Sequence, residues 1–295
     1  VFLTLMSLFD PGDEVLVPSP RWGTFTSQLT MLGARAVTVD TSRTEFLPTV
    51  EQLAAARTSR TRGVLLNTPH NPTGAVYPAE LLADIADWAG RHGLWLVLDE
   101  CYGDLVFAPA RHVHPVQRVR DCVERVVTIG SFSKSFAVTG WRVGYLYGPR
   151  PVIDAAARFQ THLTSHAPSV LQYALVPAAR GAADDFVCTT VALLEQRLAL
   201  ADKELADVRW LSHRRPGGAF YLFLDCSQVI GRRYGERVLD TGADLAALLL
   251  DEAGVAVVAG SAFGVDDHLR LSLTADEERL RTALARMKEV LGRVE

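Results

Sequence analysis

Short β-rich runs alternate with helical stretches through the first half of this 295-residue chain. In the clearest unit, between residues 63 and 98, Pro78 opens a helix and the pair His92-Gly93 ends it before the next run. Such alternation favours an α/β fold with a mainly parallel sheet, because parallel strands need crossover connections and helices supply them. The predicted strands are 14–17, 34–39, 63–66, 94–98, 125–129 and 143–147.

The pattern changes after about residue 181, where a long helical stretch begins and more widely spaced strands follow. We therefore predict a large α/β domain over residues 1–180 and a smaller α+β domain over residues 181–295. Turn chemistry alone explains the run Pro216-Gly217-Gly218, which we interpret as a bend before a strand. The elements predicted for the second domain are helices 186–205 and 243–252, a closing helix, and strands 208–212, 220–224, 255–258 and 269–273.

Composition narrows the class of protein. Hydrophobic residues make up 48% of the chain, enough for a sizeable core, and the formal net charge is −4 with basic residues scattered along the sequence. We therefore expect no nucleic-acid or membrane partner, and a cytoplasmic location, because no apolar run approaches the roughly 18 residues of a membrane span. The four cysteines and eight histidines show no metal-binding spacing, so we expect no metal site.

Polar side chains follow three of the predicted strands, at the point where each strand ends. Asn71 follows strand 63–66, Asp99 closes strand 94–98, and Ser131 and Lys134 follow strand 125–129. Because ligands of open α/β sheets bind beyond the carboxyl ends of the strands, we expect these side chains to meet at one edge. An amide, a carboxylate and an amine are thereby brought to a common site.

Lys134 lies in the run Ser-Phe-Ser-Lys-Ser-Phe-Ala-Val-Thr-Gly-Trp-Arg, between the hydroxyl of Ser131 and the guanidinium of Arg142. A lysine amine can form a Schiff base with the aldehyde of pyridoxal 5'-phosphate, and nearby hydroxyl and guanidinium groups can hold its phosphate. The freed amine can also carry a proton from the substrate Cα. Alone, a lysine after a strand is equally well explained as a surface charge.

The other candidates match further needs of this cofactor. Asp99 can pair with the pyridine nitrogen, Tyr102 and Asn71 can hydrogen-bond the phenolic oxygen and lower the pKa of the Schiff base, and Trp22 can stack on the ring. Each residue separately is explained by a strand cap, a turn or a packed aromatic ring. Their joint occurrence favours a pyridoxal phosphate site, with Lys134, Asp99 and Tyr102 as the catalytic residues.

Six ordered motifs give the chain a family resemblance. It resembles the class I/II aminotransferases of fold type I, the aspartate aminotransferase superfamily, over essentially its whole length. The motifs are Pro-Gly-Asp-Glu-Val at 11–15, Asn-Pro-Thr-Gly at 71–74, Asp-Glu-Cys-Tyr at 99–102, Ser-Phe-Ser-Lys at 131–134, Gly-Trp-Arg-Val-Gly at 140–144 and Leu-Arg-Leu-Ser at 269–272.

The resemblance implies a sheet of the seven-stranded type with helices on both faces, followed by the smaller α+β domain. It also implies pyridoxal phosphate as cofactor, the roles given above for Lys134, Asp99, Tyr102 and their neighbours, and a homodimer. Arg270 is implied as the clamp for the substrate α-carboxylate, a role that residue pattern alone does not reveal. Cis peptides are implied at Ser19-Pro20 and Asn71-Pro72.

We accordingly expect an aminotransferase that moves an amino group from an L-amino acid to a 2-oxo acid. A pyridoxal-phosphate lyase of the same fold, a non-catalytic effector-binding domain and an inactive fragment stay open as alternatives, and the donor and acceptor are not specified. Chains of this family carry roughly 90 to 100 residues before the position of Val1, including a phosphate-binding loop, so we expect an N-terminally truncated chain.

Overall fold

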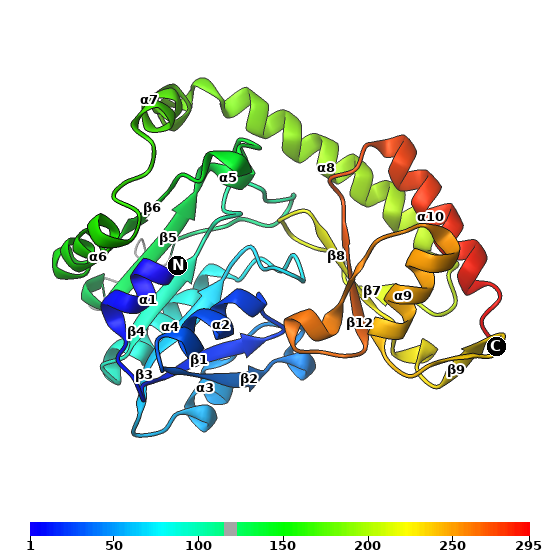
Figure 1. Ribbon diagram of the computed structural model, residues 1–295, viewed down its shortest axis with the longest axis horizontal. Coiled ribbons are helices and arrows are strands. Elements are labelled where there is room, and N and C mark those ends of the chain that lie inside the picture. Colours follow the sequence, from blue (N-terminus) through cyan, green and yellow to red (C-terminus); the bar gives the residue numbers. More distant parts are fainter. Residues whose placement is uncertain (115–122) are drawn as a thin grey trace.

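The computed structural model describes residues 1–114 and 123–295 and contains a six-stranded sheet with the order β2-β1-β3-β4-β5-β6 (Figure 1). The first five strands of this order are parallel, and β6 is antiparallel to β5. All six predicted strands are confirmed, whereas the seven implied by the resemblance are not all present among the described residues. The strands are β1 (Glu14–Ser19), β2 (Arg35–Asp40), β3 (Thr61–Asn67), β4 (Trp95–Asp99), β5 (Val126–Ser131) and β6 (Gly144–Tyr147).

Helices cover both faces of this sheet, as expected, because successive strand residues point to opposite sides. Leu65 and Val97 pack against α1 (Phe2–Leu8) and α2 (Gly23–Met31), whereas Leu66 and Leu98 belong to the core formed with α3 (Val50–Ala56) and α4 (Ala79–Arg91). Helix α4 starts directly after Pro78 and ends before Gly93, whose φ is +66°, so both predicted boundary signals are confirmed. The strands β1, β3, β4 and β5 are therefore buried on both sides, whereas the edge strands β2 and β6 are partly exposed.

A second, antiparallel sheet has the order β11-β12-β8-β7 and is covered by three helices. Its core draws on residues from Leu194 to Val294, together with Phe107. In Figure 1, α8 runs from beside α7 to the helices on this second sheet. The elements are α8 (Asp184–Leu205), α9 (Gly242–Ala253) and α10 (Glu277–Leu291), and strands β7 (Ser212–His213), β8 (Tyr221–Asp225), β11 (Val258–Ala259) and β12 (His268–Ser272).

Two strand predictions in this region are corrected. Of the predicted strand 208–212, only Ser212 lies in a strand, β7, whereas Val208 and Trp210 are buried in the core outside any strand and the Trp210 indole donates to the Leu291 carbonyl. Of the predicted strand 255–258, only Val258 lies in a strand, β11. The hairpin of β9 (Arg232–Tyr234) and β10 (Arg237–Leu239) was not predicted, because strands of three residues are too short for a periodic signal.

Helices α6 (Arg150–Leu163), α7 (Ser169–Pro177), the π-helical turn η5 (Ala178–Ala182) and α8 link the two sheets. We propose that the boundary between the two domains lies after residue 180, as predicted, because Gly181 has a φ of +92° and interrupts the helix there. Short helices α5 (Phe132–Ser135), η1 (Ser42–Thr44), η3 (Val123–Arg125), η4 (Thr139–Trp141), η6 (Ser227–Val229) and η7 (Gly260–Phe263) complete the described elements.

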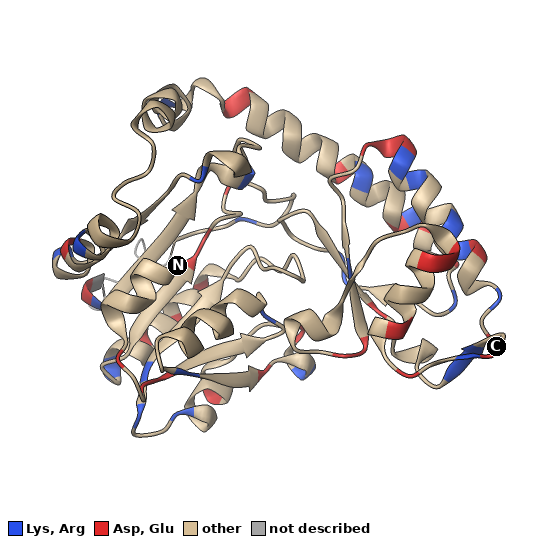
Figure 2. Cartoon of the chain, viewed as in Figure 1, with Lys and Arg blue, Asp and Glu red and all other residues tan. Residues whose placement is uncertain are grey.

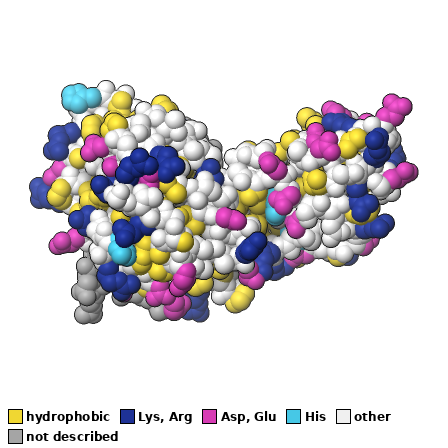
Figure 3. Space-filling view, turned by 90° about the horizontal axis from the view of Figure 1, so that it is seen from below, with side chains coloured by type: hydrophobic (Ala, Val, Ile, Leu, Met, Phe, Trp, Pro, Cys, Tyr) yellow, Lys and Arg dark blue, Asp and Glu magenta, His cyan; other side chains and the backbone are white. Residues whose placement is uncertain are grey.

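Charged side chains of both signs are interspersed over the face shown in Figure 3, and Figure 2 shows their highest density around α10. The first half of α8 is mostly uncharged after its acidic start at Asp184 and Asp185. Among the described residues, none of the helices is both long and apolar enough to cross a lipid bilayer.

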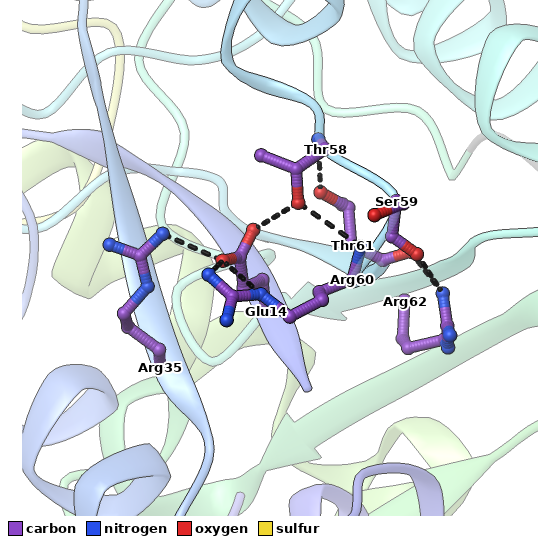
Figure 4. A network of polar contacts seen from close by, with 7 residues as sticks. All are labelled: Glu14, Arg35, Thr58, Ser59, Arg60, Thr61 and Arg62. Atoms are coloured by element: carbon purple, nitrogen blue, oxygen red, sulfur yellow. Dashed lines mark hydrogen bonds and ion pairs between the residues drawn. The ribbon is translucent and has the colours of Figure 1, made fainter. Parts of the chain in front are cut away.

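A buried carboxylate ties the first residues of β1 and β2 to the loop that precedes β3, at the amino end of the parallel sheet and opposite the edge at which the polar residues were predicted. Glu14 accepts hydrogen bonds from Thr58 Oγ1 at 2.6 Å and Arg35 Nη2 at 2.7 Å, and pairs with Arg60 at 2.8 Å (Figure 4). The Thr58 hydroxyl and the two guanidinium groups lower the pKa of Glu14 to about 2, against the effect of burial.

Substitution Glu14→Gln is expected to destabilise the protein by about 2 kcal/mol at pH 7, because a buried hydrogen-bonded charge is lost. The folded-state pKa of about 2 lies below the ordinary value of 4.5. The stabilisation is therefore complete above pH 4.5 and fades as the pH falls towards 2. Urea unfolding at pH values from 7 to 2.5 measures the difference in free energy of unfolding between the wild type and Glu14→Gln, which should shrink as the pH falls. The same difference at pH 7 and pH 2.5 would contradict the prediction. Glu277→Gln, on the exposed surface of α10, serves as the control.

Candidate active site

A cavity of about 810 Å³ opens at the carboxyl ends of the parallel strands and is lined by residues of both sheets. β3, β4 and β5 end in register, with Asn67 opposite Asp99 and Asp99 opposite Ile129, so the residues that follow them reach the same space. All of the predicted site residues line it: Trp22, Asn71, Asp99, Tyr102, Ser131, Lys134, Arg142 and Arg270.

Lys134 is presented by the short helix α5, which begins directly after β5. The Ser131 hydroxyl oxygen caps this helix by accepting from the Ser133 N–H at 3.1 Å, which leaves the hydroxyl hydrogen available to a ligand. Lys134 Nζ lies 5.9 Å from the ring centre of Tyr102 and 5.7 Å from that of Phe220. The amine is therefore flanked by aromatic rings inside the cavity.

Asp99 is 4% exposed, and its Oδ1 accepts a hydrogen bond from the Cys101 N–H at 3.0 Å. Burial raises the pKa of the Asp99 carboxyl, and the hydrogen bonds from Cys101 act in the opposite direction. A cation bound next to Asp99 would offset the cost of burial and favour the carboxylate. The protonated nitrogen of a pyridine ring is such a cation.

Arg270, on β12, reaches across to the loop that follows β3. Its Nη1 donates to Asn71 Oδ1 at 2.9 Å, and its guanidinium carbon lies 4.3 Å from the Tyr221 ring centre and 4.8 Å from that of Phe263. Arg270 Nε is buried without a hydrogen-bond partner in the described structure. A partly buried guanidinium with an unused donor favours an anionic ligand, such as a carboxylate.

The remaining predicted residues lie at the rim. Trp22 is 37% exposed and packs edge-on against Phe25, with ring centres 5.3 Å apart. Arg142 has a φ of +55°, and its Nη1 donates to the Thr139 carbonyl at 2.9 Å. Both side chains line the cavity, so the geometry is compatible with the stacking and phosphate-binding roles predicted for them, which stay predictions.

Sequence reasoning missed Asn67 and Tyr221. Asn67 Nδ2 donates to the Asp99 carbonyl at 2.9 Å and its Oδ1 accepts from the Asn71 N–H at 2.8 Å, so it fixes one predicted residue relative to another. Its position at the end of β3 was an available signal. Tyr221 lines the cavity from the second sheet, and no local pattern marks it.

The turn Pro216-Gly217-Gly218 was interpreted as a bend explained by turn chemistry alone. That interpretation is incomplete, because the turn also makes contacts with the first domain. The N–H groups of Gly217 and Gly218 both donate to the Gly74 carbonyl, at 2.9 and 3.0 Å. Gly74 has a φ of +69°, and a Cβ added there would lie 2.3 Å from the Cβ of Pro216. The turn therefore docks the second sheet against the loop that carries Asn71.

Both cis peptides implied by the resemblance, Ser19-Pro20 and Asn71-Pro72, are confirmed. Two further cis bonds, Thr68-Pro69 and Ala108-Pro109, were not predicted. Three of the four thus lie in the loops that follow β1 and β3, close to the cavity.

The family model for aminotransferase class I and II matches residues 1–287. The chain belongs to this family. The relatives it matches are named aminotransferases, and this chain is accordingly an aminotransferase and an enzyme. The lyase and effector-binding alternatives receive no support from the comparisons.

Relatives of known name agree with this assignment. The aspartate aminotransferase of Streptomyces avermitilis is 37% identical over 99% of this chain and 72% of its own length. A probable aspartate/prephenate aminotransferase of Aquifex aeolicus is 36% identical over 100% of this chain and 74% of its own.

Solved structures give the same result for the fold. The Rhizobium meliloti aspartate aminotransferase matches with a TM-score of 0.95 and 37% identity, over 100% of this chain and 74% of that one. The Thermus thermophilus aspartate aminotransferase with maleate matches with a TM-score of 0.90 and 36% identity, over 98% of this chain and 72% of that one. The expected fold type is therefore confirmed.

Gly74→Ala is expected to destabilise this aminotransferase by about 3 kcal/mol, because alanine is strained in the left-handed conformation of residue 74 and its Cβ would clash with Pro216. Gly93→Ala is the matched control, because its φ of +66° is nearly the same but nothing lies within 4 Å of the added Cβ. We expect about 1 kcal/mol for the control. Chemical denaturation of both variants measures the difference, and equal losses would show that the docking contact is not tight.

Proposed function

We propose that this aminotransferase binds pyridoxal phosphate through Lys134 and transfers the amino group of an L-amino acid, aspartate first among the candidates, to a 2-oxo acid. The observation that carries the proposal is the convergence of the Lys134 amine, the buried Asp99 carboxyl and the unpaired Arg270 donor in one cavity. The choice of aspartate rests on the names of the relatives.

The side chains around the cavity fit the cofactor. Asp99 would pair with the pyridine nitrogen, Tyr102 and Asn71 would hold the phenolic oxygen, and Trp22 would cover the ring. Ser131 and Arg142 would hold the phosphate. When bound, pyridoxal phosphate supplies a ring that accepts negative charge from the substrate Cα.

The protein's own groups then have separate tasks. Arg270 binds the substrate α-carboxylate, with the help of the Asn71 amide, and so fixes the direction of the Cα–H bond. Once the substrate amine has taken its place on the cofactor, the freed Lys134 Nζ would accept the proton from Cα and deliver it to the cofactor's aldehyde carbon. The aromatic rings of Tyr102 and Phe220 limit water around this amine.

We also propose a homodimer in the cytoplasm. Large apolar side chains are exposed along α6, α7 and the first half of α8. This part of α8 carries few charges after Asp184 and Asp185 (Figure 2). Exposed apolar side chains in this number favour a protein partner, and a second copy of the chain is the simplest one. The exposed side chains are Phe159, Leu163, Val170, Tyr173, Val176, Phe186 and Leu193.

Labelling tests the cofactor assignment. The chain contains three lysines, Lys134, Lys203 and Lys288, of which Lys134 lines the cavity. After incubation with pyridoxal phosphate and reduction with borohydride, we expect mass spectrometry to find the pyridoxyl group on Lys134 and none in Lys134→Arg. Labelling of Lys203 and Lys288 to the same extent would contradict the proposal.

Arg270→Lys is expected to raise the KM for aspartate about tenfold or more, with a smaller change in kcat, because an ammonium group cannot form the bidentate contact. Labelling of Lys134 should persist in this variant. Arg279→Lys, an exposed position on α10, is the matched control and should leave KM unchanged. A KM for Arg270→Lys equal to that of the control would remove Arg270 from the substrate site.

A further inference from the structure

Two tyrosines from different sheets share a buried hydrogen bond beside Lys134. The hydroxyl oxygens of Tyr102 and Tyr221 lie 2.9 Å apart, and the two residues are 4% and 6% exposed. Tyr102 lies three residues after Asp99, whereas Tyr221 begins β8. Their rings pack edge to face, with centres 5.8 Å apart. Both side chains line the cavity, so the pair is part of the wall that faces the cofactor.

Either hydroxyl could be the donor, and the surroundings decide between them. The guanidinium carbon of Arg270 lies 4.3 Å from the centre of the Tyr221 ring. Burial raises the pKa of Tyr221, while the charge of Arg270 lowers it. For Tyr102, burial is again the largest cause of a raised pKa, and the neighbouring Cys101 raises it further. Tyr221 is thus the more acidic hydroxyl and the better donor of the two.

A tyrosine hydroxyl carries one hydrogen, so the direction of this bond determines what Tyr102 can do. If Tyr221 donates to Tyr102, the Tyr102 hydrogen is free to point at a ligand in the cavity. Accepting a hydrogen bond also polarises the Tyr102 O–H group and makes it a stronger donor. The opposite direction would occupy the Tyr102 hydrogen inside the wall.

We propose that Tyr221 is a positioning residue, which donates its hydroxyl hydrogen to Tyr102 and so directs the Tyr102 hydroxyl at the phenolic oxygen of pyridoxal phosphate. The proposal rests on the proposed function and deepens it. It links the Arg270 carboxylate clamp to the phenolic oxygen through two side chains, since Arg270 lies over the ring of Tyr221 and Tyr221 holds Tyr102.

The test uses the visible absorbance of the protein loaded with pyridoxal phosphate, followed against pH. A strong hydrogen bond to the phenolic oxygen favours its anion and lowers the pH midpoint of the absorbance change. Tyr221→Phe keeps the ring under Arg270 and removes only the hydroxyl. We expect its midpoint to rise by about 0.5 pH unit, and that of Tyr102→Phe to rise further.

The double variant separates a directed hydrogen bond from a general effect on packing. Once Tyr102→Phe has removed the intermediate hydroxyl, adding Tyr221→Phe should not move the midpoint again. Tyr234→Phe is the matched control. Tyr234 lies on the β9–β10 hairpin, far from the cavity, and its hydroxyl contacts Glu252 on α9. It should leave the midpoint unchanged.

The outcomes distinguish the two proposals. A wild-type protein that loads Lys134 but has the same midpoint as Tyr221→Phe overturns the role of Tyr221 alone. A further shift in the double variant, equal to that of Tyr221→Phe by itself, does the same. A wild-type protein that takes no pyridoxal phosphate on Lys134 overturns the proposed function and, with it, this inference.

Discussion

The parallel pairing of β3, β4 and β5 is the constraint on which the site depends. Their registers bring Asn67, Asp99 and Ile129 level with one another, so the three chain segments leave the sheet at one edge. The buried cores on both faces hold that register, because a slip by one residue would exchange the two faces of each strand. Cavity, carboxylate and lysine all follow from this alignment.

This alignment explains why much of the site was predictable from sequence. Hydrophobic runs locate strands, and strand ends locate the edge. Asp99 ends its strand, and Asn71 and Lys134 follow theirs within a few residues. Local sequence patterns therefore predict the large sheet, the helices on both of its faces and most of the residues that line the cavity. Arg270 was not, since a single arginine on a short strand carries no such signal. Only the resemblance to a family identified it.

What could not be predicted depends on contacts between distant parts of the chain. The hydroxyls of Tyr102 and Tyr221 are 119 residues apart in sequence, and the Gly74 contact with the turn at 216–218 likewise spans the two sheets. The strands β7 and β11 contain only two residues each, so backbone pairing defines them and no periodicity can. Tertiary packing, which local patterns do not encode, fixes these features.

The docking of Gly217 and Gly218 on the Gly74 carbonyl has a consequence for how this scaffold can diversify. The contact is made by backbone atoms, and close approach rather than side-chain identity holds it together. Cavity side chains that make no bond between the two sheets can therefore be exchanged without disturbing this backbone contact with the loop that carries Asn71. The same backbone arrangement can thus accommodate amino acids of different shape, because the side chains that select the substrate need not be those that hold the two sheets together.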